Sequence, residues 1–277
     1  MKIAYTVWTW LLDPYNKFAK GETKELQKVQ FEKAAREISF LGYKGMENFN
    51  ILVETFEEDI ESLKKILEKY HLDLTAIYTY LKADFENDKQ MAERCIRMLN
   101  VIGCDILNLQ GPKHAPGGTT KEDVLETARM AMIIGKMAYE NDVKLCFHPH
   151  WGSTVEKEEE IEYFMANTDP KYVHLCLDTA HTQLMDMDPI KIVEKYFDRI
   201  AYMHFKDVDP DVTITPERPM NRFRALGQGT VDFKGVYKKL NDLGYYGTIC
   251  VELDYPIICN FQSAQTSRRY LYEVLGI

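Results

Sequence analysis

Long hydrophobic runs are missing from this 277-residue sequence. A membrane-spanning helix needs about 20 consecutive apolar residues, and no stretch approaches that length, so we expect no transmembrane segment. The N-terminal stretch MKIAYTVWTWLLDPY contains only a short apolar run, which Asp13 and Pro14 interrupt. It also lacks the small-residue cleavage site of a secretory signal peptide. These absences predict a cytoplasmic protein.

An excess of basic residues is also missing. The 34 Lys and Arg are outnumbered by 43 Asp and Glu, which gives a formal net charge of −9. An acidic surface repels a phosphate backbone, so we expect no nucleic-acid partner.

Paired cysteines are absent, because none of the six cysteines forms a C-x-x-C motif. Cys146, Cys176 and Cys250 fall inside predicted strands, where cysteine behaves as a small buried apolar residue. The pattern predicts reduced thiols and argues against a zinc–thiolate site.

What the sequence does contain is an alternation of strand-like and helix-like periods from end to end. The predicted strands cover residues 2–7, 44–47, 73–79, 105–109, 143–148, 173–178, 200–205 and 247–252. Helical spacing of apolar residues is clearest at residues 30–42, 59–71, 89–103, 120–142 and 233–244. For the helix at 120–142 we expect Thr119 or Thr120 as the cap, with Glu122 as its reciprocal partner.

This alternation predicts a single (β/α)8 TIM barrel domain over residues 1–277. The alternative is a doubly wound nucleotide-binding sheet, but no G-x-G-x-x-G follows the first strand. Two connections, residues 111–120 and 206–230, are long for a compact domain, and such loops are usually functional.

Four of the predicted strands end in side chains that bind metals or transfer protons. The segments are KLCFHPH with His148 and His150, HLCLDTAH with Asp178 and His181, IAYMHFKD with His204, and TICVELD with Glu252. In a parallel barrel the carboxyl ends of the strands meet at one face, where catalytic groups lie. Two imidazoles and two carboxylates there suit Mn²⁺, Co²⁺, Mg²⁺ or Zn²⁺.

Each residue also has a purely structural interpretation. Asp178 could cap a helix that begins at Thr179, and His204 could be a core histidine that hydrogen-bonds a neighbouring strand. Glu252 could not stay buried without a partner, so it must meet a metal or a basic group.

The succession HPHWGS, MANTDPK, LDTAH, HFKD, LGQGTVDF and VEL resembles the xylose isomerase-like sugar isomerase/epimerase superfamily, and within it the inosose dehydratases. The resemblance implies one divalent metal, Mn²⁺ or Co²⁺ before Mg²⁺ or Zn²⁺. It implies His148, Asp178, His204 and Glu252 as ligands, and His181 as a contact to substrate oxygens. It also implies a small polyhydroxy ketone as substrate and allows a homo-oligomer.

One position departs from the ketose 3-epimerases of that superfamily, which have Glu where this sequence has His148. Two carboxylates leave a dication site neutral, which favours Lewis acidity toward a carbonyl. We therefore expect a metal-stabilised enediolate that loses water, with His150 or Glu252 as base and Lys206 among the candidate acids. Sugar isomerisation or epimerisation is the alternative; a nucleic-acid hydrolase and a silent sugar-binding barrel fit less well.

Further substrate contacts are predicted at the same face. Glu47, expected at the end of the second strand, could bind a hydroxyl or form a salt bridge. Trp8 and Trp10 could form an apolar wall, and Arg222 or Arg224 could reach the substrate from the seventh loop. Gly227 and Gly229 are expected to let the backbone turn close to the site.

Overall fold

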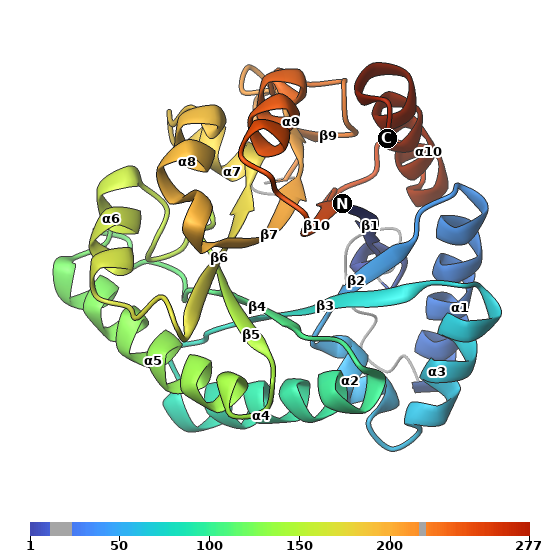
Figure 1. Ribbon diagram of the computed structural model, residues 1–277, viewed down its shortest axis with the longest axis horizontal. Helices are drawn as coiled ribbons and strands as arrows, with labels where there is room; N and C mark the ends of the chain where they lie inside the picture. The colour runs from blue at the N-terminus through green and yellow to red at the C-terminus, as the bar shows by residue number, and fades with distance from the viewer. Residues whose placement is uncertain (12–23, 216–219) are drawn as a thin grey trace.

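Eight parallel strands close into a barrel in the computed structural model, which describes residues 1–11, 24–215 and 220–277. The strands are β1 (Lys2–Thr6), β2 (Gly45–Phe49), β3 (Asp73–Tyr80), β4 (Ile106–Gln110), β5 (Lys144–His148), β6 (Val173–Asp178), β7 (Ile200–Phe205) and β10 (Thr248–Val251). Each pairs with the strands next to it in sequence order, and β10 pairs with β1 (Figure 1). The predicted (β/α)8 fold is confirmed. Asp13, Pro14 and part of the 206–230 loop lie outside the described residues.

Helices surround the barrel and cover its outer face (Figure 1). They are α1 (Lys24–Phe40), α2 (Ile51–Phe56), α3 (Ile60–Lys69), α4 (Phe85–Ile102), α5 (Lys121–Tyr139), α6 (Glu158–Ala166), α7 (Thr179–Leu184), α8 (Pro189–Tyr196), α9 (Phe233–Asp242) and α10 (Asn260–Tyr270). Short turns of 3-10 helix lie at η1 (Trp8–Leu11) and η2 (Phe197–Arg199), and η3 (Leu271–Leu275) is π-helical. Among the described residues, no helix combines the length and apolar character needed to cross a membrane.

The cap of α5 corrects one detail of the sequence analysis. Thr120 does cap this helix, but its reciprocal partner is Asp123, whose carboxylate accepts from the Thr120 backbone N–H at 2.8 Å. Asp123, three residues after the cap, is at the position whose side chain points back to it, which Glu122 is not.

Alternation along the strands divides the buried side chains into two cores. Outward-facing residues pack against the helices in one large cluster. Inward-facing residues fill the barrel with a small cluster: Ala4, Ala76, Ile106, Cys146, Cys176, Tyr202 and Cys250. Cys146, Cys176 and Cys250 are fully buried free thiols, as predicted. This inner cluster fills the barrel directly below the side chains at the carboxyl ends of the strands.

Two features near the carboxyl ends of the strands differ from expectation. Glu47 does not end its strand, because β2 continues to Phe49 past an irregularity between Met46 and Glu47. The seventh connection contains a small antiparallel pair, β8 (Asp207–Val208) and β9 (Phe223–Arg224). A two-residue pairing between distant segments leaves no periodicity for sequence analysis to detect.

Candidate metal centre

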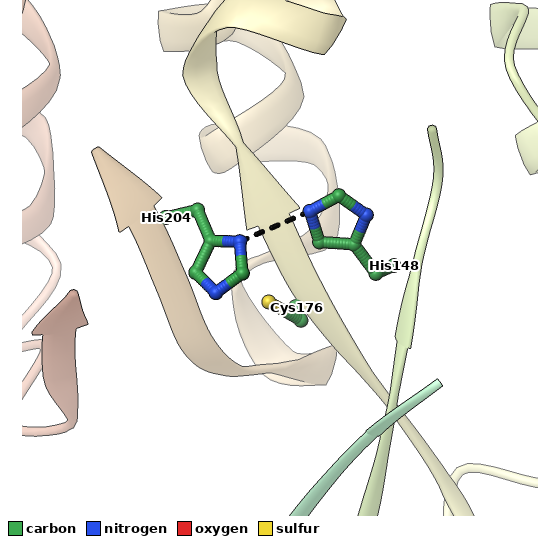
Figure 2. Close-up of side chains that lie close together, drawn as sticks. All are labelled: His148, Cys176 and His204. Carbon is green, nitrogen blue, oxygen red and sulfur yellow. Dashed lines mark hydrogen bonds between the residues drawn. The ribbon is translucent and has the colours of Figure 1, made fainter. Parts of the chain in front are cut away.

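The four side chains named as metal ligands in the sequence analysis meet at the carboxyl end of the barrel. His148 Nε2 lies 3.1 Å from His204 Nδ1, and Glu252 Oε2 lies 2.8 Å from the same His204 nitrogen. One ligand atom from each of His148, Asp178, His204 and Glu252 falls within 4.8 Å of the others. Figure 2 shows the two imidazoles reaching toward each other from β5 and β7, on either side of β6.

Asp178 caps a helix with one carboxylate oxygen and leaves the other oxygen without a partner, so its two predicted roles are compatible. Its Oδ1 accepts from the His181 backbone N–H at 2.8 Å and caps α7. Its Oδ2 has no hydrogen-bond partner among the described residues, and it lies 3.8 Å from His148 Nε2 and 3.9 Å from His204 Nδ1. A buried carboxylate oxygen without a donor is costly. A divalent cation between these atoms would satisfy it, so the residues present fit such an ion.

The far nitrogens of both imidazoles are held by partners outside the set of four. His204 Nε2 lies 3.0 Å from Glu47 Oε2, and His148 Nδ1 lies 3.4 Å from the Tyr78 hydroxyl. Glu47 also accepts from the Asn108 side-chain amide at 2.9 Å and is fully buried. Such outer partners fix the ring orientation and tautomer of metal-binding histidines. Glu47 and Tyr78 therefore direct His204 Nδ1 and His148 Nε2 toward Asp178.

Burial and neighbouring charges set the protonation of this group. Burial, with His204 adding to it, lowers the pKa of His148 well below its ordinary value, so His148 is neutral. Burial also opposes charge on His204, but Cys176, Glu47 and Glu252 together raise the pKa of its imidazole well above the ordinary value. Burial raises the pKa of Asp178 to about 6, against the opposing effect of Lys206.

A fully buried lysine lies beside the four candidate ligands. Lys206 Nζ is 2.6 Å from Asp254 Oδ2, 3.3 Å from Glu252 Oε1 and 3.3 Å from His181 Nε2, and it lies over the Phe223 ring. Burial alone would lower the pKa of Lys206, but Asp254, Glu252 and Asp178 raise it above its ordinary value. Lys206 therefore remains an ammonium ion in this pocket.

Asp254 is a site residue that the sequence analysis did not name. It is buried and follows Glu252 by two residues, a spacing that keeps both side chains on one face of an extended chain. That spacing at the end of a strand is the signal that could have identified it.

His150 and His181 continue the cluster toward solvent. Their ring centroids are 3.8 Å apart, and His150 is only half-buried whereas His181 is buried. His150 Nδ1 lies 2.5 Å from the Trp151 carbonyl oxygen, so this nitrogen carries the hydrogen and Nε2 keeps a lone pair. Burial, and after it His148, lowers the pKa of the His150 imidazole.

The remaining predicted substrate contacts lie at different distances from this cluster. Trp10 is buried and donates its indole N–H to Glu37 at 2.7 Å, and the two line a surface pocket with Asp254. Arg224 Nη1 donates to the Phe223 carbonyl of its own loop at 2.9 Å. Trp10 thus lies in the same pocket as Asp254, whereas Arg224 is hydrogen-bonded to its own loop.

An aromatic row beside the imidazoles was only partly anticipated. Trp8 stacks on Phe49 at 4.9 Å between ring centroids, and Phe49 stacks on Tyr78 at 4.6 Å. Tyr78 in turn meets His148 edge-on at 5.3 Å. Of these residues only Trp8 was predicted from the sequence. Phe49 lies beyond the strand predicted at residues 44–47, and Tyr78 lies inside β3, where an aromatic residue usually indicates core packing.

The comparisons with known proteins agree with this architecture. The sequence profile of the xylose isomerase-like TIM barrel family matches residues 35–274. An inosose dehydratase from Clostridium beijerinckii is 28% identical over 274 residues, which cover 89% of this chain and 90% of that protein.

Solved structures show the same fold at lower identity. A xylose isomerase-like TIM barrel protein from Mycobacterium smegmatis in complex with magnesium superposes with a TM-score of 0.78 at 17% identity, covering 99% of this chain and 96% of that chain. The IOLI protein with a bound zinc atom gives 0.75 at 17% identity, covering 100% and 98% of the two chains. With a profile match over most of its length and a closed parallel barrel, this chain belongs to the xylose isomerase-like TIM barrel family.

Proposed function

We propose that this protein is a divalent-metal-dependent enzyme that removes water from a polyhydroxy ketone, a keto-cyclitol or keto-sugar. The proposal rests mainly on the contact between the four candidate ligands and the buried Lys206. His148, Asp178, His204 and Glu252 converge on one point, and Glu252 links them to the buried ammonium of Lys206 at 3.3 Å. A relative that is similar over nine-tenths of its length is an inosose dehydratase, which supports dehydration as the reaction.

These four residues would hold the proposed cation, Mn²⁺ or Co²⁺, which would supply Lewis acidity toward a ketone substrate. Two related structures contain zinc or magnesium, which supports a divalent ion without choosing among them. Glu252 is better suited to be a ligand than a base. Against the effect of burial, Lys206 and His204 hold its pKa well below the ordinary value, so it is a carboxylate. Both of its oxygens are already engaged, since Oε2 lies 2.8 Å from His204 Nδ1 and Oε1 lies 3.3 Å from Lys206 Nζ.

His150 is the residue best placed to remove the α-proton. It is half-buried, so a substrate can reach it, and its free Nε2 lone pair is available because Nδ1 is bound to the Trp151 carbonyl. Its lowered pKa keeps the imidazole neutral at physiological pH, which is the form a general base requires.

Lys206 is the proposed acid for the departing β-hydroxyl. Its pKa is raised, so it cannot act as a base at neutral pH, but hydroxide is a much stronger base than an amine and can take its proton. The C–H electron pair forms the new double bond, the C–O bond breaks, and the oxygen leaves as water.

After the reaction, His150 holds one extra proton and Lys206 lacks one, so a proton transfer between them would restore both. Protonated His150 lies against His181, and His181 Nε2 is 3.3 Å from Lys206 Nζ. Burial, and after it His150, lowers the pKa of His181 well below its ordinary value, so a proton passing through it does not remain there. A shift of the His150 ring that brings its Nε2 to the unpartnered His181 Nδ1 would let this row return the proton taken from carbon to the lysine.

The test is to load purified protein with Mn²⁺ or Co²⁺ and offer 2-keto-myo-inositol, 3-keto-glucosides and a panel of ketoses in D₂O. Loss of water with a new enone or dione absorbance is the expected result. Deuterium incorporation at constant composition would instead identify an isomerase or epimerase. No turnover and no exchange with any polyhydroxy ketone would overturn the proposal.

A pair of variants tests the role of His150. His150→Gln should lower kcat by about 10²–10⁴-fold, the usual contribution of a general base, while Mn²⁺ affinity stays unchanged. His174→Gln is the matched control, because His174 is the second residue of β6 and lies toward the opposite end of the barrel. A His150→Gln enzyme with the activity of the control would remove His150 from the mechanism.

A further inference from the structure

A cysteine side chain lies beside the two imidazoles of the candidate metal centre. Cys176 precedes Asp178 by two residues on β6, so both side chains point into the barrel and the thiol is one step deeper. Cys176 Sγ and one nitrogen each of His148 and His204 lie within 4.8 Å of one another. Figure 2 shows the sulfur beside the two rings.

We propose that His148, Cys176 and His204 form a second coordination set that takes thiophilic ions, Zn²⁺ or Cd²⁺, directly beneath the oxygen-containing set. The proposal rests on the proposed metal centre, because the two sets share both imidazoles. This second set would compete with the first for the metal ion. The absence of C-x-x-C motifs had argued against any site that includes a thiolate.

The geometry suits an ion of this class. Zinc binds imidazole nitrogen at about 2.0–2.1 Å and thiolate sulfur at about 2.3 Å in tetrahedral sites, so two nitrogen ligands stand about 3.3 Å apart. The His148–His204 nitrogen separation of 3.1 Å is already close to that value. Thiolate and imidazole favour Zn²⁺ and Cd²⁺, whereas carboxylates and water favour Mn²⁺ and Mg²⁺.

The deeper set is enclosed by the barrel, and the thiol of Cys176 is fully buried. On binding, the ion replaces the thiol proton, which leaves to solvent. Because His148 and His204 serve both sets, an ion held by Cys176 excludes an ion held by Glu252.

Cadmium is the probe, since a Cd²⁺–thiolate bond gives an ultraviolet charge-transfer band that nitrogen and oxygen ligands do not give. The chelator-treated full chain, with the exposed Cys259 replaced by serine, is titrated with Cd²⁺ in the presence of Mn²⁺. We expect a band that saturates at one Cd²⁺ per chain and release of any bound Mn²⁺.

Three serine variants locate the sulfur. Cys176→Ser should abolish the band and weaken Cd²⁺ binding at least about tenfold. Cys146→Ser, a buried thiol of the same inner cluster, should leave the band intact. Cys250→Ser should also leave it intact, although Cys250 lies near Glu47 and His204 in another possible grouping.

A measurement without the Cys176 variant covers the case in which that variant does not fold. X-ray absorption of the Zn²⁺-loaded Cys259→Ser protein should show one sulfur at about 2.3 Å. Only nitrogen and oxygen neighbours, a Cd²⁺ band that survives Cys176→Ser, or simultaneous binding of Mn²⁺ and Cd²⁺ would overturn the proposal. Tight Mn²⁺ binding without any sulfur signal would overturn the thiolate set but leave the proposed four-residue metal centre intact.

Discussion

Glu47 is the residue whose interpretation the structure changes most. From the sequence we expect it to be a substrate contact at the end of a strand or a salt-bridge partner. In the structure its carboxylate lies inside the barrel, 3.0 Å from His204 Nε2 and 2.9 Å from the Asn108 amide nitrogen. Strand alternation says which face a residue takes but not how deep it lies, because depth depends on the stagger of the neighbouring strands.

Glu47→Gln should therefore weaken Mn²⁺ binding by about 10–100-fold, the usual effect of losing an outer partner of a ligand histidine. The amide keeps the shape, and Asn108 can rotate to present its unpartnered Oδ1 to the new N–H group. Chelator competition measures the affinity. Asp88→Asn is the control, because Asp88 is a buried carboxylate that binds the backbone N–H groups of Lys82 and Asp84 instead. Equal affinity in the two variants would contradict the role given to Glu47.

The pH dependence of metal binding is set by individual residues. Burial raises the pKa of Asp178 to about 6, so protons compete with the cation for this carboxylate below that pH and not above it. The pKa of His204 is also raised, so at neutral pH its imidazole is protonated and must lose a proton when the cation binds.

Apparent Mn²⁺ affinity should consequently rise with pH across about pH 5 to 8, by up to about tenfold per pH unit for each proton released. Calorimetric titrations in buffers of different ionisation enthalpy would count the protons. Affinity that is flat over this range would show that the site binds the ion without losing protons.

At the scale of elements, the sequence predicts regular strands well. Residues 173–178 and 200–205 were predicted with the bounds that β6 and β7 have, because apolar runs with clear ends mark buried parallel strands. Helix α2, with six residues and no side-chain cap, carried no such signal. The β8–β9 pair was missed because its hydrogen bonds join segments that are far apart in sequence.

Gly227 and Gly229, which follow β9, hold the seventh loop against Asp207 through their backbone N–H groups. The Asp207 carboxylate accepts from the backbone N–H groups of Gly227 and Gly229 at 2.9 and 2.8 Å. A Cβ atom at Gly229 would lie 2.4 Å from Asp207 Oδ1. This contact fixes the loop next to Lys206, so the glycines were rightly associated with a close turn of the backbone.

Gly229→Ala should separate Asp207 from the loop and lower the free energy of unfolding by about 1–3 kcal/mol. Turnover should fall further than Mn²⁺ affinity, because Lys206 and the Phe223 ring beneath it lose their support while the four ligands do not. Gly117→Ala is the matched control, since no atom lies within 4 Å of the Cβ it would add. Thermal unfolding curves that coincide for the two variants would refute this role of the loop.

At the scale of the whole molecule, closure of the barrel brings the four candidate metal ligands together. The four candidate ligands come from or directly follow β5, β6, β7 and β10, which are neighbours in the closed sheet. No two of these ligands lie within one helix or hairpin, so the unfolded chain has no preformed site. An ion that binds only the folded barrel stabilises it through mass action, by about 2.7 kcal/mol when its concentration is 100 times the Kd.

The most direct measurement is the binding of Mn²⁺ to chelator-treated wild-type protein and to Asp178→Asn. Asparagine caps a helix as well as aspartate does, so the variant keeps the cap of α7 and loses only the charged oxygen that faces the imidazoles. The account predicts one Mn²⁺ per wild-type chain and a loss of at least about tenfold in affinity in the variant. A wild-type chain that binds no Mn²⁺, or a variant that binds it equally well, would contradict the central claim.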